Sequence, residues 1–241
     1  MNNAWRSYHA RMNTIGQTKR DMMLQHARSS ISRRLVDSLA YHTVLIDQIE
    51  REVGIINKAD LDTKTIVAMP GEKLVHGGLV EYENHKWLIT ELDVSNEVYE
   101  RGLMRQCNYI LKWTDASGNI IEKWCIVEDG TKYLTGERSE QMMTIGDARI
   151  SVTIAKDADT AKIVRGKRFL IDDPTASSIH AYQVTKLNRL FNLYNDRGVY
   201  RFILIEDHLT KNDNTELMIA DYYSEETSGA DESVQHGGGW L

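Results

Sequence analysis

The first regular pattern along the chain is a narrow apolar stripe on an otherwise basic segment. An apolar side chain recurs at every fourth position, with arginines between, at Met23, Ala27, Ile31 and Leu35. This spacing places the stripe along one face of a helix. Thr18 followed by Asp21 fits a capping box, in which a hydroxyl and a carboxylate satisfy the first free amides. The pattern predicts one capped helix, and its thin stripe indicates docking on another surface rather than nucleation of a core.

After Tyr41 the four-residue spacing of apolar side chains gives way to short apolar runs. Residues 42–46 and 52–56 are short β-favouring runs around a polar centre, which is typical of a hairpin. A helix continued through Val53 is the alternative, because Leu39, Ile46, Ile49 and Val53 can also share a helical face. We favour the strands.

The middle of the chain predicts a meander of antiparallel strands. Segments 78–83 and 86–92 flank Asn84-His85, where a tight turn is expected. A long strand over 98–114 then leads through a turn at 115–118 into a return strand over 119–128. This turn would place Thr114 opposite Asn119.

That register puts one set of side chains on a single face, as a wall of a core: Cys107, Tyr109, Leu111, Trp113, Ile120, Trp124 and Ile126. Cys107 and Cys125 would then lie on opposite faces and should not form a disulfide. We interpret Cys107 as a small buried apolar residue rather than a nucleophile.

A second β unit is predicted to follow, with strands over 148–154, 167–171, 180–187, 199–206 and 216–220 and a turn at 195–198. The expected fold class is mainly β, with two consecutive small β-barrel or β-sandwich units preceded by an N-terminal α-helical arm. The expected division is a basic arm with one helix (1–40), a first β-rich domain (41–137), a second β-rich domain (138–224) and an acidic, glycine-rich flexible tail (225–241).

Bulk composition excludes several classes without selecting one. The chain has 241 residues, of which 41% are hydrophobic and 27% charged, as in ordinary globular proteins. No apolar run approaches the roughly 18 residues of a membrane span. The first residues lack the apolar core of a signal peptide, so we expect synthesis in the cytoplasm.

Charge is distributed unevenly along the chain. Residues 1–34 hold seven basic residues and one acid, although the whole chain carries a net charge of −6. Residues 206–232 hold nine acids and one base. Such ends can meet different partners, or each other in neighbouring copies. The alternative is a solvated helix face followed by a disordered tail.

No motif for catalysis emerges from the sequence. It lacks a phosphate-binding glycine loop, a nucleophile elbow and a zinc-binding histidine pair. Two acid-rich segments, 172–173 and 206–208, could bind a divalent cation, but acids at strand ends are common. We therefore expect no enzymatic activity, no cofactor and no metal.

Seven sequence runs resemble a family of structural proteins from tailed bacteriophages and prophages of Gram-positive bacteria: residues 41–47, 69–72, 77–81, 106–113, 124–133, 168–174 and 219–223. The resemblance covers nearly the whole chain. Members of that family look like neck or head–tail connector components, and no catalytic residues carry over from it.

The resemblance implies a virion protein that forms an oligomeric ring, joins the portal to the tail, and lines the DNA path. Its expected partners are copies of itself, the portal and tail proteins, and genomic DNA through non-specific contact, with no membrane. The residues expected to dock the arm on a partner are Arg6, Arg11, Arg20, Met23, Ala27, Arg28, Ile31, Arg33, Arg34 and Leu35. The alternatives are a tail or baseplate adaptor and a nucleic-acid-binding accessory protein.

Overall fold

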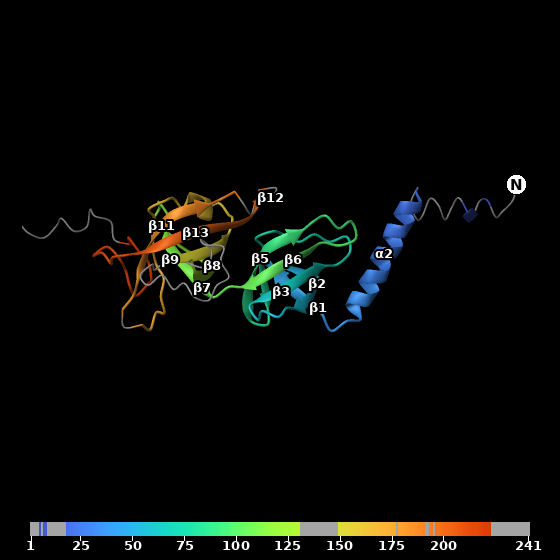
Figure 1. The fold of residues 1–241 in the computed structure, drawn as a ribbon, viewed down its shortest axis with the longest axis horizontal. Helices are drawn as coiled ribbons and strands as arrows, with labels where there is room; N and C mark the ends of the chain where they lie inside the picture. Colours follow the sequence, from blue (N-terminus) through green and yellow to red (C-terminus); the bar gives the residue numbers. More distant parts are fainter. Residues whose placement is uncertain are drawn as a thin grey trace, which may run out of the picture.

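The computed structural model describes residues 18–130, 149–176, 178–190, 193–194 and 196–222, together with Trp5, Ser7 and Tyr8. Within this part the protein is mainly β, with helix α2 (Lys19–Val36) ahead of two β units in a row (Figure 1). This arrangement confirms the general fold class. The expected tail, most of the first 17 residues and the segment 131–148 lie outside the described residues.

The first unit is a closed antiparallel barrel in the order β1-β2-β3-β6-β5-β4. Its strands are β1 (Tyr41–Ile46), β2 (Ile49–Asn57), β3 (Thr63–Ala68), β4 (Leu79–Tyr82), β5 (His85–Asp93) and β6 (Arg101–Gln106). The hairpin after Tyr41 is thus confirmed, and the continued helix is wrong. The barrel closes between β1 and β4, which pair at Leu45–Glu81 and Ile46–Val80.

Two tight turns explain the register of the barrel. Asp47 and Gln48 between β1 and β2, and Glu83 and Asn84 between β4 and β5, all have positive φ angles. Two consecutive positive φ values are the signature of type I′ turns, whose twist matches that of the flanking strands. The predicted turn at Asn84-His85 is therefore one residue late, because His85 already pairs with Tyr82.

The second unit is an antiparallel sheet in the order β10-β11-β13-β9-β8-β7, with β12 paired to β13. Its elements are β7 (Tyr109–Thr114), β8 (Ile120–Asp129), β9 (Arg149–Ala155), the 3-10 turn η2 (Thr160–Lys162), β10 (Arg168–Leu170), β11 (Ala181–Asn188), β12 (Leu193–Tyr194) and β13 (Arg197–Asp207). The sheet curls until its edges meet. The Tyr109 hydroxyl on β7 donates a hydrogen bond of 3.2 Å to the Leu170 carbonyl on β10.

The boundary between the units falls earlier than predicted. The expected strand over 98–114 is two strands, β6 in the barrel and β7 in the second sheet, separated only by Cys107 and Asn108. β7 and β8 therefore belong to the second unit, and the division between 137 and 138 is wrong. Strand length misled the prediction, because the apolar pattern continues while the chain crosses between sheets.

The β7–β8 register is also one residue off. Thr114 pairs with Ile120 rather than with Asn119. The Asp115 carboxylate accepts hydrogen bonds from the amides of Ser117 and Asn119, and Gly118 has a φ of +80°. The connection between Thr114 and Ile120 is therefore five residues long, one more than the predicted turn, and it contains a left-handed glycine.

The altered register changes the composition of the core. Leu111 and Trp113 share the core of the second sheet with Cys125, whereas Ile126 packs with Cys107 elsewhere. The predicted strand over 216–220 is likewise a turn region with a single bridge between Asn214 and Ile219.

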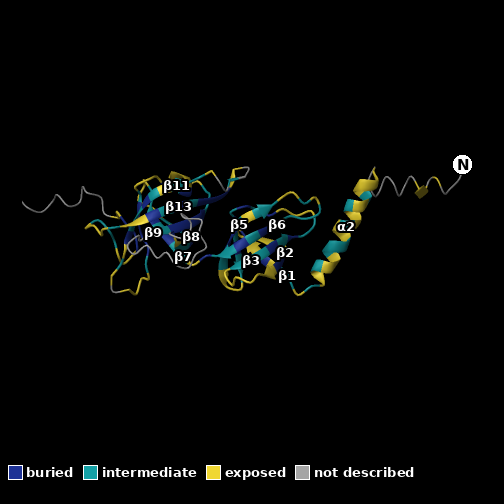
Figure 2. Cartoon of the chain, viewed as in Figure 1, coloured by how far each residue is buried: buried dark blue, intermediate teal, exposed yellow. Residues whose placement is uncertain are grey.

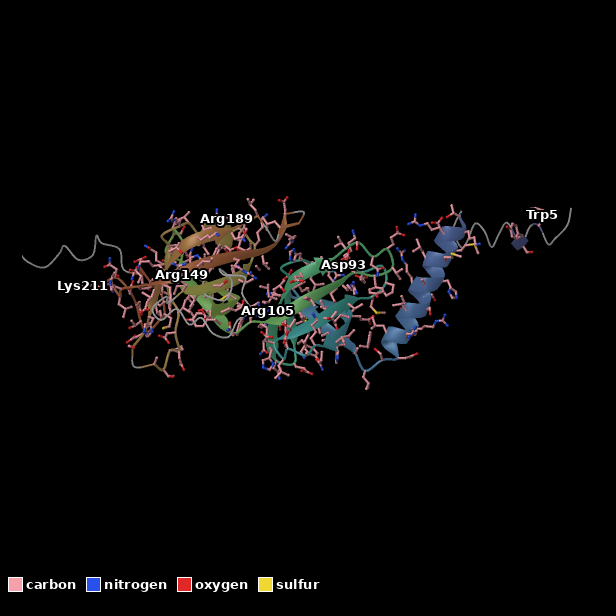
Figure 3. The ribbon with its side chains drawn as sticks, in the orientation of Figure 1. Trp5, Asp93, Arg105, Arg149, Arg189 and Lys211 are labelled. Carbon is pink, nitrogen blue, oxygen red and sulfur yellow. The ribbon has the colours of Figure 1, made fainter. Side chains whose placement is uncertain are left out.

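A separate apolar cluster joins the two units. Leu88 and Cys107 pack against Ile126 and Val199, with Leu79, Trp124 and Ala155 around them. Backbones also meet here, since a Cβ added at Gly77 would lie 2.1 Å from the Gly198 carbonyl oxygen. Arg105, near the junction in Figure 3, pairs with Glu128 at 2.5 Å. The two units therefore pack directly against each other at this junction.

Candidate docking surface

Helix α2 begins where the sequence predicts. The Thr18 hydroxyl accepts a hydrogen bond of 3.2 Å from the Asp21 amide, and the Asp21 carboxylate accepts one of 3.1 Å from the Thr18 amide. Arg33 and Arg34 lie in the last turn, where positive charge is favoured by the helix dipole. The capping box is confirmed.

The apolar side of α2 lies on the protein's own barrel through a thin contact. Ala27, Ile31 and Leu35 are half-buried, and no residue of the helix is fully buried (Figure 2). Leu35 lies over Gly54 of β2, where an added Cβ would come within 2.6 Å of the leucine Cδ1. A side chain at position 54 would require the Leu35 methyl group to shift, so glycine there lets Leu35 lie close to the strand.

Two arginines complete the attachment of α2. Arg20 forms an ion pair with the Glu97 carboxylate, and Arg28 Nη2 donates a hydrogen bond of 2.7 Å to the Glu97 carbonyl. These groups are exposed, and exposed ion pairs contribute about 0–1 kcal/mol. The helix is therefore attached to the protein's own barrel, but the attachment is weak.

The ten residues expected to dock the arm divide into three groups. Met23, Arg33 and Arg34 are exposed, with Met23 at 60%. Arg20, Arg28, Ala27, Ile31 and Leu35 occupy the side of α2 that meets the barrel or are half-buried near it. Arg6 and Arg11 lie outside the described residues. The sequence reasoning missed Val36 and Leu39, which are exposed at the end of the helix.

The opposite end of the molecule is built around a buried arginine. Arg168 of β10 bonds three carboxylates, through Nε to Asp207 at 2.8 Å, through Nη2 to Asp213 at 2.9 Å, and through Nη1 to Asp221 at 2.7 Å. The Asp213 side chain is only 1% exposed. Arg168 thus holds the loop 208–222 against the end of the second sheet.

Burial and hydrogen bonding act in opposite directions on these charges. Burial favours neutral Arg168, but the hydrogen bonds that its guanidinium donates to Asp213, Asp221 and Asp207 outweigh burial and raise its pKa. Burial would likewise raise the pKa of Asp213, but Arg168 and the backbone amides of Asp221 and Thr210 lower it overall. Arg168 and Asp213 therefore both stay charged near neutral pH.

An apolar cluster reinforces the same loop. Met218 and Ala220 are buried against Leu170 and Ala181. We call Arg168, its three aspartates and this cluster the C-terminal clasp. Its only local signal in the sequence is an arginine at the start of the predicted strand 167–171, because the aspartates are more than 35 residues away.

The remaining candidate groups have structural partners. Asp172 accepts a 2.5 Å bond from His180 Nδ1, and Asp207 belongs to the clasp, so both acid-rich segments are engaged. Over the described ranges, no three metal-ligating side chains gather at one place. In the same ranges no helix is long and apolar enough to cross a membrane.

Both cysteines are buried free thiols. Burial raises the pKa of Cys107 to about 12. Burial, followed by the proximity of Cys107, raises the pKa of Cys125 still further. Neither thiol is activated as a nucleophile.

Comparison with known proteins finds one family. The YomX N-terminal domain matches residues 8–106, which comprise the segment of α2 and the whole barrel and end at the last residue of β6. The match thus ends where the structure places the unit boundary. No curated protein and no solved structure matches the chain.

Proposed function

We propose that this protein is a structural component of a bacteriophage virion, a head–tail connector that forms an oligomeric ring between portal and tail. YomX is a phage-type protein name, from a Bacillus prophage, and its N-terminal domain is what residues 8–106 resemble. The family match and the sequence resemblance support a phage origin. The connector role is our own inference.

The observation that carries the proposal is the weakly held basic helix at the end of a β body whose two units pack against each other. A ring subunit must keep its shape while one surface meets a different surface of its neighbour. The inter-unit cluster around Leu88 and Val199 supplies the fixed shape. Helix α2, held by Leu35 and two exposed arginine contacts, supplies an element that can engage a partner.

The test is complementation of a phage that lacks this gene. A variant without residues 1–37 should give a soluble, folded β body, because no residue of α2 is buried. Heads and tails should then accumulate separately, as counted by electron microscopy. A matched control, Leu61→Ser, changes one side chain that is 91% exposed and lies outside α2, and it should restore joined particles.

Two outcomes would count against the proposal. Deletion particles that assemble and infect would remove any docking role from the arm. Gold labelling of the protein at the distal tail would instead make it a tail or baseplate adaptor.

A further inference from the structure

The described surface carries opposite charge at the two ends of its long axis. Helix α2 lies at one end, and the loop that follows β13 lies at the other, where Figure 3 labels Lys211 (Figures 1 and 3). Between residues 19 and 40 there are five basic residues and two acids. Around the clasp, residues 168–173 and 206–222 hold seven acids and two basic residues, Arg168 and Lys211.

Each end also exposes large apolar side chains beside its charges. At the basic end, defined by Arg33, Arg34, Val36 and Leu39, Leu39 is fully exposed. At the acidic end, defined by Asp173, Glu206, Leu209, Glu216 and Leu217, both leucines are exposed. Apolar area gives a contact its affinity, and opposite charge gives it orientation.

We infer that the basic end of one copy binds the acidic end of the next, in a head-to-tail contact between identical chains. This inference rests on the proposed ring-forming function and identifies the surfaces that would build the ring. The like-charged ends disfavour the symmetric alternatives, because two basic ends or two acidic ends repel each other. A head-to-tail contact can repeat, and the angle it sets decides between a closed ring and an open filament.

The C-terminal clasp fixes the shape of the acidic end before a partner binds. Three aspartates pair with Arg168 and fix the loop 208–222, on which Glu216 is exposed. Glu206 in β13 and Asp173 after β10 are exposed as well. The partner therefore meets a preformed surface and has little ordering entropy to overcome.

The test uses two full-length variants that each neutralise one end. The first is Arg33→Gln/Arg34→Gln/Leu39→Ser, and the second is Glu206→Gln/Leu209→Ser/Glu216→Gln. All six positions are exposed, so both variants should fold as the wild type does. Neutral replacements are chosen because reversed charges would create new complementary pairs.

Size-exclusion chromatography with light scattering measures the outcome. The wild type should form species larger than one chain, weakened at least tenfold in affinity between about 0.05 and 0.5 M salt. Each variant alone should be a monomer. An equimolar mixture should form a two-chain complex and nothing larger, because it has one intact basic end and one intact acidic end.

Three results would overturn the inference. The first is a wild type that stays monomeric up to about 1 mM, a concentration at which an interface of even modest affinity associates. The second is association of either variant alone at the wild-type level, and the third is an equimolar mixture that stays monomeric. Failure of the virion experiment would leave a positive mixing result intact, so the two hypotheses fail separately.

Discussion

The two ends of the molecule are attached to the β body in opposite ways. Helix α2 at one end has no buried residue and is held by Leu35 and two exposed arginine contacts. The loop 208–222 at the other end is clasped by a buried arginine, three carboxylates and a small apolar cluster. The first attachment can open at little cost in free energy, whereas the second is part of the folded core.

The difference teaches how one chain can combine an adaptable surface with a permanent one. Exposed ion pairs exchange readily with water and salt, so a helix held by them can turn to a new partner. A buried charge network cannot be opened in part, because each separated charge would remain desolvated. The two ends should therefore respond very differently to single substitutions.

The largest effect is expected at the clasp. Arg168→Ala leaves Asp213 buried without its counter-ion and should lower the free energy of unfolding by about 3–5 kcal/mol. Urea titration followed by fluorescence measures it. The matched control is Arg101→Ala, whose side chain is 58% exposed beside Asp93 and should change stability by less than about 1 kcal/mol. An equal decrease in the free energy of unfolding in the two variants would mean that the clasp contributes no more than an exposed ion pair.

The charge of Asp213 predicts how the stability difference between wild type and Arg168→Ala depends on pH. The folded-state pKa of Asp213 lies below that of an ordinary carboxyl, so its contribution is present above about pH 4. That contribution disappears as the pH falls through the folded-state pKa. The stability gap between wild type and Arg168→Ala should narrow below pH 4, and a gap that widens there would contradict the assigned charges.

An intermediate effect is expected where the two units touch. Gly77 and Gly71 both have positive φ angles, so an alanine at either position costs about 1–2 kcal/mol in backbone conformation. Only at Gly77 does the added Cβ meet the Gly198 carbonyl, and overpacking adds about 1–3 kcal/mol. Gly77→Ala should therefore be less stable than Gly71→Ala in the same urea titration. Equal stability would show that the units do not press together there.

The smallest effect is expected in α2. Thr18→Ala removes the capping hydroxyl and should weaken the helix by about 1 kcal/mol. Hydrogen exchange should become several-fold faster at α2 amides, while the urea midpoint stays unchanged, because the helix opens locally. Thr175→Ala, which removes an exposed hydroxyl bonded to Asp173, is the control and should leave α2 unchanged. A shifted midpoint in Thr18→Ala would mean that α2 unfolds only with the body.

Sequence predicts this fold where the determining contacts are local. The capping box of α2, the hairpin after Tyr41 and the strands β9, β11 and β13 all follow from neighbouring residues. The β7–β8 register failed by one residue because the Asp115 side chain bonds two loop amides and lengthens the turn. Such side-chain bonds inside a loop leave no periodic pattern.

The candidate surfaces were predicted less completely than the fold. The stripe from Ala27 to Leu35 marks the correct face of α2, but no pattern shows that Gly54, far along the chain, receives it. The clasp needs Arg168 to meet Asp207, Asp213 and Asp221 across a sheet end, and pairs so distant in sequence are set by topology. The sequence shows which residue types are present, but it does not show which distant residues meet in space.

The crossing at Cys107 and Asn108 has a mechanical consequence. Only two residues separate β6 from β7, and an apolar cluster packs beside them. The distance between the two β units is therefore restrained. A molecule bound to the barrel would be kept at a constant spacing from one bound beyond the clasp. Force applied at one end is then transmitted to the other rather than absorbed by a linker.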